Sequence, residues 1–376
     1  MSTATKQILG GRECVRVCIA QVSPVYMNRD ASAQRAVETI REAAVNGADL
    51  VVFTEAWLSG YPHWTEGWDS PLSRWAAGRT RFFDEAVLVP SEATDMIARA
   101  ARESHVHVVL GCNEIDPRAG NGTIYNSLLF FDRTGAIIGR HRKLMPTFTE
   151  RLFWGCGDGS DLEVYDTDIG RIGGLICGEN LMTPVRAAMC AMGEDIHIAV
   201  FPGSFALHTG PQLQEWDMSG HFWGHFVTRA HAFEAGCFVC SGSGYLDPDE
   251  IAADFPYRSS MNIGWARGGS QVVSPLGVPI VGPVEGSQLI YADCHAWMIK
   301  AVKAIVDTLG HYARPDAVRV QIRKNDQWQL PGEAYSSGRL ARVERPALQR
   351  AADAYEVPME RVEAVADARG LLIGKS

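Results

Sequence analysis

The sequence lacks a hydrophobic run long enough to cross a membrane. No stretch reaches the roughly 18 to 20 consecutive apolar residues that a membrane-spanning helix needs, and residues 1–6 contain no apolar core of a secretory signal. These two absences argue against a membrane protein and against an exported one. We therefore expect a protein of the cytoplasm with no membrane partner.

The chain also has fewer basic residues than acidic ones. The chain has 35 lysines and arginines against 44 aspartates and glutamates, which leaves a formal net charge of -9 and a pI near 5.7. A protein that binds nucleic acid needs a basic surface that offsets the phosphate charge, so we expect no nucleic-acid partner. With 376 residues, 46% of them hydrophobic, the chain can bury a large core as one domain or as two closely packed halves.

Zinc-binding spacing and a disulfide framework are absent as well. The nine cysteines are an odd number scattered through apolar segments, which favours reduced thiols. Cys237 and Cys240 lie three residues apart in a predicted strand and so face opposite sides of a sheet, which argues against a redox pair. His221, His225 and His231 follow a helical pattern, and we interpret them as surface or interface residues rather than metal ligands. No metal and no cofactor are expected.

The chain does contain three segments in which a hydrophobic strand ends in a chemically reactive residue. They are residues 47–62 with Glu55, residues 140–150 with Lys143 and Glu150, and residues 173–180 with Cys177. Open α/β folds place their chemistry at the carboxyl ends of strands, so Cys177 is a candidate nucleophile. A buried cysteine more often serves as a small hydrophobic residue, but the other two segments favour the catalytic interpretation.

Together these segments resemble the nitrilase branch of the carbon-nitrogen hydrolase superfamily, which is built on a Glu-Lys-Cys triad. Residues 58–62 match the branch signature around Glu55, and residues 143–155 resemble nitrilases rather than more distant amidases. The third segment differs at one position, because many nitrilases have tryptophan where this chain has Gly178. That difference bears on the shape of the pocket. The resemblance covers about residues 13–325.

The chemistry of nitriles explains why these residue types are needed. A nitrile carbon is a poor electrophile, so attack requires a thiolate at Cys177, and Glu55 is the predicted base that takes the thiol proton. Lys143, assisted by the backbone N–H of Gly178, offsets the negative charge that develops on the nitrile nitrogen. Glu150 matches the second carboxylate of the family and is predicted to orient Lys143. The alternative for Glu150 is an ordinary glutamate of a surface loop.

Three further expectations concern the surroundings of the nucleophile. Glu179 is expected to brace the loop through backbone N–H groups, and Asn180 to cap the helix that follows. Aromatic side chains are candidates for the pocket wall, with core packing as the alternative for each; they are Trp57, Tyr61, Trp154 and Phe205. Such a wall favours an apolar or aromatic nitrile without identifying one.

The predicted activity is hydrolysis of an organic nitrile to a carboxylic acid and ammonia through a thioimidate and a thioester. The same triad would serve a cyanide hydratase or dihydratase, or an aliphatic amidase, and these stay open as alternatives. A catalytically silent scaffold that forms filaments is the alternative outside enzymes. It is disfavoured because no member of the triad is missing from the sequence.

Local patterns predict an α/β fold. Asp30 is expected to cap a first helix that ends before Gly47, and residues 57–75 are expected to form an aromatic loop. Helices are predicted at 92–103, 183–192 and 218–234, and strands at 15–21, 50–53, 107–112, 125–131, 136–140, 173–176, 196–201, 271–274, 279–281 and 288–292. A glycine, an aspartate and a strand recur at 47–53 and 193–201, which indicates two similar halves. We predict two face-to-face sheets with helices outside, and the resemblance implies the same four-layer αββα sandwich.

The resemblance also implies a homodimer joined through helices of the second half. We expect residues 1–12 to be a tail, residues 13–310 the hydrolase domain and residues 311–376 a C-terminal extension. Within the extension, residues 318–322 suggest one more strand, and Val357-Pro358 should break residues 346–368 into two short helices. The extension is either a partly ordered tail or a segment that pairs with neighbouring subunits in spirals or filaments.

Overall fold

The computed structural model describes residues 7–64, 71–118, 122–204, 223–324, 349, 352–353 and 358–360. The chain divides into two units. The first unit comprises Met1–Ile115 and Thr123–Lys324 and contains all the helices and strands discussed below. The second comprises Asp116–Gly122 and Asn325–Ser376. In it the guanidinium of Arg118 pairs with the carboxylate of Asp116, and the helices expected after residue 346 lie largely outside the described residues.

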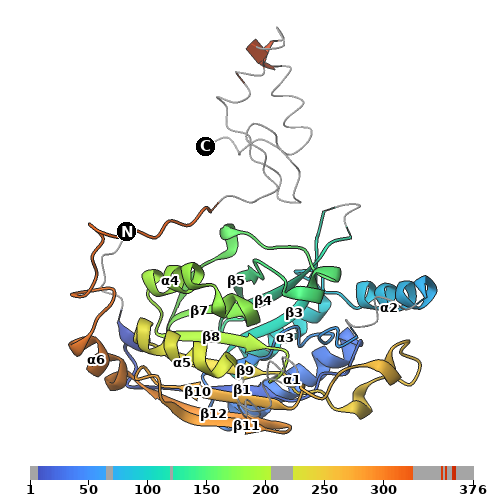
Figure 1. The fold of residues 1–376 in the computed structure, drawn as a ribbon, viewed down its shortest axis with the longest axis horizontal. Coiled ribbons are helices and arrows are strands. Elements are labelled where there is room, and N and C mark those ends of the chain that lie inside the picture. The colour runs from blue at the N-terminus through green and yellow to red at the C-terminus, as the bar shows by residue number, and fades with distance from the viewer. Residues whose placement is uncertain are drawn as a thin grey trace, which may run out of the picture. The chain divides into compact units, whose positions relative to one another are not determined.

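Two six-stranded sheets form the centre of the first unit (Figure 1). The first sheet has the order β12-β1-β2-β3-β4-β5, with β12 at Gln288–His295, β1 at Cys14–Gln21, β2 at Leu50–Phe53, β3 at His107–Ile115, β4 at Ile124–Phe131 and β5 at Ile137–Arg142. The second has the order β11-β10-β9-β8-β7-β6, with β11 at Pro279–Glu285, β10 at Gly268–Val273, β9 at Phe238–Ser243, β8 at Ile196–Phe201, β7 at Gly170–Ile176 and β6 at Val164–Thr167. In each sheet three central strands are parallel and the outer pairings are antiparallel.

The two sheets begin their central strands in the same way. The backbone N–H of Asp49 donates to the carbonyl of Arg16 (2.7 Å), and the Asp49 carboxylate accepts from the N–H of Arg16 (2.9 Å). In the second sheet Asp195 makes the same two bonds with Arg171, at 2.8 and 3.0 Å. An aspartate thus ties each central strand, β2 or β8, to the strand on one side, as the repeated sequence pattern suggested.

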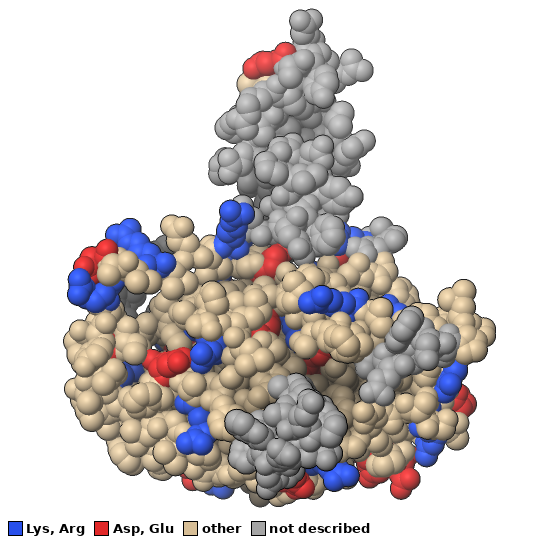
Figure 2. All heavy atoms as spheres, viewed as in Figure 1, with Lys and Arg blue, Asp and Glu red and all other residues tan. Residues whose placement is uncertain are grey.

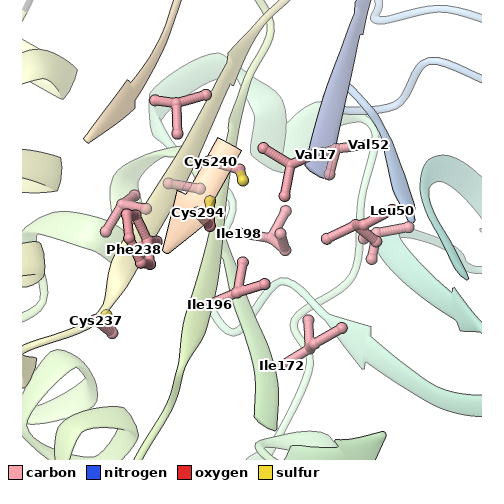
Figure 3. Packing of buried hydrophobic residues seen from close by; sticks show 14 of the residues in the cluster. Val17, Leu50, Val52, Ile172, Ile196, Ile198, Cys237, Phe238, Cys240 and Cys294 are labelled. Atoms are coloured by element: carbon pink, nitrogen blue, oxygen red, sulfur yellow. The ribbon is translucent and has the colours of Figure 1, made fainter. Parts of the chain in front are cut away.

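Side chains of both sheets interleave in a single core (Figure 3). Val17, Leu50 and Val52 project from the first sheet toward Ile196 and Ile198 of the second, and all five are fully buried. Burying each such side chain stabilises the fold by about 1.5–3 kcal/mol. The next residues along β1 and β2 point the other way, because side chains alternate along a strand.

Helices cover the two outer faces (Figure 1). On the first sheet, α1 (Arg29–Val45) and α3 (Glu92–Ser104) bury alanines and isoleucines against the outward side chains of β1, β2 and β3. On the second sheet, α4 (Thr183–Met192) packs Ala188 and Met189 against Leu175, and α5 (Trp223–Ala235) packs on β9 and β10. The result is the predicted four-layer αββα sandwich.

Several local predictions were wrong. Asn28, not Asp30, caps α1, because its side chain accepts from the N–H of Ala31 (3.0 Å). Residues 71–75 were assigned to an aromatic loop, but α2 (Leu72–Asp84) begins there and buries Phe82 in an aromatic cluster with Trp64. Residues 318–322 form no strand, and α6 (Ala296–Ile305) was not foreseen. No helix of the described residues is both long and apolar enough to cross a membrane.

Candidate active site

Glu55 lies just past the end of β2, in a turn that the neighbouring strand holds closely. A Cβ atom on Gly111 of β3 would come 2.1 Å from the carbonyl oxygen of Thr54, so only glycine lets β3 approach this turn. The side chain of Glu55 is completely buried, and its Oε1 accepts from the amide of Asn126 at 2.7 Å. The predicted position at a strand end is correct.

Lys143 follows β5 and is also completely buried. Its backbone N–H donates to the carbonyl of Asn126 (2.8 Å), which continues the β4–β5 pairing to the site. Its Nζ lies 2.8 Å from Oε1 of Glu55 and 2.7 Å from Oε2 of Glu150. One ammonium is therefore shared by two buried carboxylates. Glu150 therefore lies where it could orient Lys143, and that predicted role stays a prediction.

Glu150 belongs to a short 3-10 helix, Phe148–Leu152, and is 3% exposed. Its carboxylate accepts from the backbone N–H of Thr147 (2.7 Å) and from the hydroxyl of Tyr61 (2.9 Å). These contacts use lone pairs that Lys143 leaves free. The alternative that Glu150 is a surface-loop glutamate is wrong.

Cys177 ends β7 and begins the 3-10 helix Cys177–Leu181. Its φ is 49°, in the left-handed region that side chains other than glycine rarely occupy. Glu179 holds this bend, because its carboxylate accepts from the N–H groups of Ile176 (2.8 Å) and Leu144 (2.7 Å) and pairs with His141 (2.9 Å). The expected bracing role of Glu179 is confirmed, and it also ties the cysteine loop to the lysine loop.

Asn180 does not cap the following helix as expected. The residue before α4 is Met182, and the side chain of Asn180 instead donates back to the carbonyl of Cys177 (3.1 Å). The helical pattern of the histidines was also misread in part. His231 is fully buried rather than exposed, Nε2 of His225 donates to the carbonyl of Gly269 (2.8 Å), and His221 lies outside the described residues.

The reactive atoms converge in one small volume. Carboxylate oxygens of Glu55 and Glu150 and the sulfur of Cys177 all lie within 4.8 Å of one another. Two carboxylates and a thiolate are also possible metal ligands. Here, however, the ammonium of Lys143 already contacts both carboxylates, and it would repel a cation placed among them.

The environment sets the protonation of the site. Burial raises the pKa of Glu55 to about 7. The charge of Lys143 opposes this increase, and the charge of Glu150 adds to it. Burial and the charge of Glu55 raise the pKa of the Cys177 thiol well above its usual range. The cysteine is therefore neutral at rest and needs a base. The Oε2 atom of Glu55 is buried and has no hydrogen-bond partner, so one carboxylate oxygen is available to accept a proton.

The raised pKa of Glu55 predicts a pH dependence. Glu55 can act as a base only when it is ionised, so kcat/KM for a nitrile should rise with pH through about 7 and then level off. A nitrile has no ionisable group in this pH range, so the rise of kcat/KM with pH reports the ionisation of the enzyme. Initial rates between about pH 5.5 and 8.5 check the prediction. A flat profile over this range would contradict it.

A small cavity opens beside Glu55. It measures about 270 Å³, counting the space open to solvent, and its wall includes two of the predicted pocket residues, Trp57 and Tyr61. Trp154 does not line this cavity; its ring centroid lies 5.9 Å from the Nζ of Lys143 and its indole N–H donates to Asn113 (3.0 Å). Phe205 lies outside the described residues.

Two residues at the site were missed. Asn126 bonds Glu55, and its only signal was a polar residue within a mostly apolar strand. His63 lines the cavity with its ring between those of Tyr61 and Trp265, at 5.1 and 4.8 Å. Burial lowers the pKa of His63 to about 3, which keeps it neutral. No sequence signal identified His63, because Trp265 is about two hundred residues away along the chain.

The chain is similar to known proteins over most of its length. Residues 16–304 match the carbon-nitrogen hydrolase family. The chain is 36% identical to a protein named Nitrilase 2 from an unknown prokaryotic organism, over 83% of this chain and 94% of that protein. It is also 36% identical to the bifunctional nitrilase/nitrile hydratase NIT4B of Nicotiana tabacum, over 82% and 86% of the two chains.

The fold has counterparts among solved structures. The crystal structure of Saccharomyces cerevisiae Nit3, a member of branch 10 of the nitrilase superfamily, matches with a TM-score of 0.61 and 24% sequence identity, over 82% of this chain and 99% of that one. At this identity the match bears on the fold alone. Together with the sequence matches, it shows that the chain belongs to the carbon-nitrogen hydrolase family, within its nitrilase branch.

Proposed function

We propose that this protein hydrolyses an organic nitrile to the carboxylic acid and ammonia, with Cys177 as the nucleophile. The observation that carries the proposal is the arrangement of one buried ammonium between two buried carboxylates, next to a thiol on a strained bend. The named activities of the nitrilase relatives point the same way.

The first half of the reaction forms a covalent bond to sulfur. Glu55 takes the thiol proton as Cys177 attacks the nitrile carbon, and the charge that develops on nitrogen is offset by Lys143. The backbone N–H of Gly178 interacts with the cysteine sulfur and stabilises the attacking thiolate. Protonation of the nitrogen yields a thioimidate attached to Cys177.

The second half consumes two waters. Addition of the first water to the thioimidate gives a tetrahedral intermediate, which expels ammonia and leaves a thioester on Cys177. Glu55 then activates the second water, which releases the acid and returns the thiol. Glu150, through its bonds to Lys143 and Tyr61, keeps the ammonium in place during both steps.

Amide release is a second candidate outcome. If the tetrahedral intermediate expels sulfur instead of ammonia, the product is the amide. The tobacco relative is named as a bifunctional nitrilase/nitrile hydratase, so this branch of the reaction is a specific possibility. Which group leaves depends on which one is protonated, and in this mechanism the ammonium of Lys143 is the donor that faces the nitrogen.

The wall of the cavity argues for an apolar or aromatic nitrile. It carries the rings of Tyr26, Trp57, Tyr61, His63 and Tyr245. We propose an apolar or aromatic nitrile as the substrate.

A panel of aliphatic, aromatic and arylaliphatic nitriles tests the function. We expect ammonia and free acid in equal amounts from at least one member, with an aromatic or arylaliphatic nitrile preferred over an aliphatic one of greater length. Ammonia assay and chromatography of the products separate acid from amide. Amide without ammonia would favour the hydratase, and hydrolysis of amides alone would favour an amidase.

We also propose a homodimer through α4 and α5. These helices pack against each other, with Arg186 of α4 bonded to Glu234 of α5 at 2.8 Å. Large apolar side chains are exposed beside this contact, with Phe233 54%, Leu181 53% and Met182 36% exposed. Figure 2 shows mostly neutral side chains over α4 and α5. Exposed apolar surface of this kind is typical of an interface.

Light scattering tests this assembly. The full chain should be a dimer or larger, and Phe233→Asp should reduce it to a monomer, because a charge buried in an apolar interface is costly. The exposed Phe83→Asp on α2 serves as the control and should leave the size unchanged. If the C-terminal extension joins dimers into spirals, truncation after residue 325 should reduce the particle to a dimer. A full chain that is already monomeric would contradict both proposals.

A further inference from the structure

A second group of buried polar side chains lies behind the nucleophile, away from the cavity. Asn180 donates through Nδ2 to the carbonyls of Cys177 (3.1 Å) and Leu175 (3.4 Å). Its Oδ1 lies 3.3 Å from Nε2 of His197, whose Nδ1 lies 2.7 Å from Oε1 of Glu194. Asn180, His197 and Glu194 are at most 1% exposed. A continuous chain of hydrogen bonds therefore links Glu194 to the backbone of the nucleophile.

The glycine-rich strand before the nucleophile makes room for this chain. A Cβ atom on Gly173 of β7 would lie 2.1 Å from Oε1 of Glu194. Any other residue at this position would displace the carboxylate. The segment of residues 173–177 therefore has two functions. It positions the thiol of Cys177, and its Gly173 leaves room for the carboxylate of Glu194.

The directions of these bonds determine the protonation of His197. The amide nitrogen of Asn180 must face the two carbonyls, because a carbonyl only accepts and the opposite orientation would set oxygen against oxygen. The amide oxygen therefore faces Nε2 of His197, which must carry a proton. On the other side Nδ1 faces Glu194. Burial alone would raise the pKa of Glu194, but contacts with His197 and His231 hold it at about 2.

A second histidine bonds the same carboxylate. His231 of α5 is fully buried, faces Oε2 of Glu194 through Nε2 (2.8 Å), and has no partner at Nδ1. Its ring centroid lies 3.9 Å from that of His197. Burial, with the neighbouring His197 adding to it, lowers the pKa of His231.

Other titratable groups lie around the cluster. Burial raises the pKa of Cys190 to about 12 and that of Cys237 well above its usual range, so both thiols are neutral. The charge of Arg186 of α4 also lowers the pKa of His231. Glu194, His231 and Cys237 also have the composition of a metal site, but a metal ion would break the bond from His231 to Glu194.

We propose that the hydrogen-bonded Glu194–His197 pair is a positioning device for the nucleophile. Through Asn180 it holds the carbonyls of Leu175 and Cys177, and with them the left-handed bend that directs the thiol toward Glu55 and Lys143. Such a strained conformation persists only when surrounding contacts hold it. Glu179 braces the same bend through N–H groups, whereas this pair acts on the carbonyls. The inference rests on the proposed role of Cys177 as nucleophile.

The first test uses the unaltered full-length protein. In protein labelled with ¹⁵N-histidine, NMR should show a proton on Nε2 of His197, the nitrogen that faces Oδ1 of Asn180. Comparison with His197→Gln assigns the signal. A His197 without a proton on Nε2 overturns the proposal. One zinc per purified chain that is lost in Cys237→Ala overturns it as well.

The second test separates positioning from support of the fold. Glu194→Gln should slow kcat and the alkylation of Cys177 by iodoacetamide about 10- to 100-fold, while KM for the nitrile stays within about twofold. His231→Gln is the matched control: it alters the same buried cluster but not the link to Asn180, so both rates should stay within about threefold. Equal losses in the two variants overturn the proposal. Alkylation and NMR need no nitrile turnover. If alkylation and NMR give the expected results but the protein hydrolyses no nitrile, this inference is supported and the proposed function is rejected.

Discussion

Replacing Cys177 with alanine is expected to lower nitrile turnover by at least about 10⁴-fold, because the covalent route disappears with the sulfur. The remaining groups cannot compensate. Lys143 and Glu55 stay in place, but water is a weak nucleophile toward a nitrile carbon. Ammonia release measures the loss. Mass spectrometry of the unaltered enzyme, quenched during turnover, should show a substrate adduct on the peptide that carries Cys177.

Cys240→Ala is the matched control for this variant. Cys240 is also a buried free thiol, in β9 within the core between the sheets. Its removal leaves a similar small void, which costs about 1 kcal/mol of stability, but it should not affect turnover. Near-normal ammonia release by Cys177→Ala would show that the sulfur is not the nucleophile. Equal losses in both variants would point to a packing effect.

Replacing Lys143 with methionine should be the most destabilising single change at the site. The side chain is of similar length, but Glu55 and Glu150 then remain buried without their shared cation. Removing one partner of a buried ion pair costs about 3–5 kcal/mol. Denaturant unfolding at about pH 8 should show this decrease in the free energy of unfolding, and turnover should fall below detection because no cation offsets the charge on nitrogen.

The pH dependence of this loss has a definite sign. Burial already raises the pKa of Glu55 to about 7 with Lys143 present, and removing the cation raises it further. The folded variant then binds a proton that the unfolded chain releases near pH 4.3, so stability is lost as pH rises through the folded pKa. The deficit should therefore be smaller at about pH 5 than at pH 8. Lys300→Met, on the exposed face of α6, should change stability by less than about 0.5 kcal/mol. A Lys143→Met variant as stable as the parent at both pH values would contradict the buried ion pair.

Much of the fold could be predicted from local sequence patterns. The bounds of α4 were predicted to the residue, and the hairpin of β4 and β5 was predicted from alternating apolar residues around a glycine turn. Such patterns succeed because periodicity and turn chemistry act over a few residues. They failed for α2, whose helical face is buried against Trp64 and Tyr257. That face is defined by partners from other parts of the chain.

The site divides in the same way. Glu55, Lys143 and Cys177 were predictable because each stands where a strand ends, and α/β folds place their chemistry at the carboxyl ends of strands. Asn126, His63 and the Glu194–His197 pair were not. Each is a polar residue in a largely apolar or aromatic part of the sequence. Its role depends on which side chains from distant segments contact it.

The sequence by itself determined which residues are reactive and on which strand ends they stand, because a hydrophobic strand followed by a polar turn is a local property of the chain. Only the tertiary structure decided how those residues are charged. Pairing and burial set the protonation of Glu55, Cys177 and Lys143. Glu55, Lys143 and Cys177 themselves lie 34 to 122 residues apart, the differences between 177 and 143 and between 177 and 55, and no local pattern encodes the interactions among them.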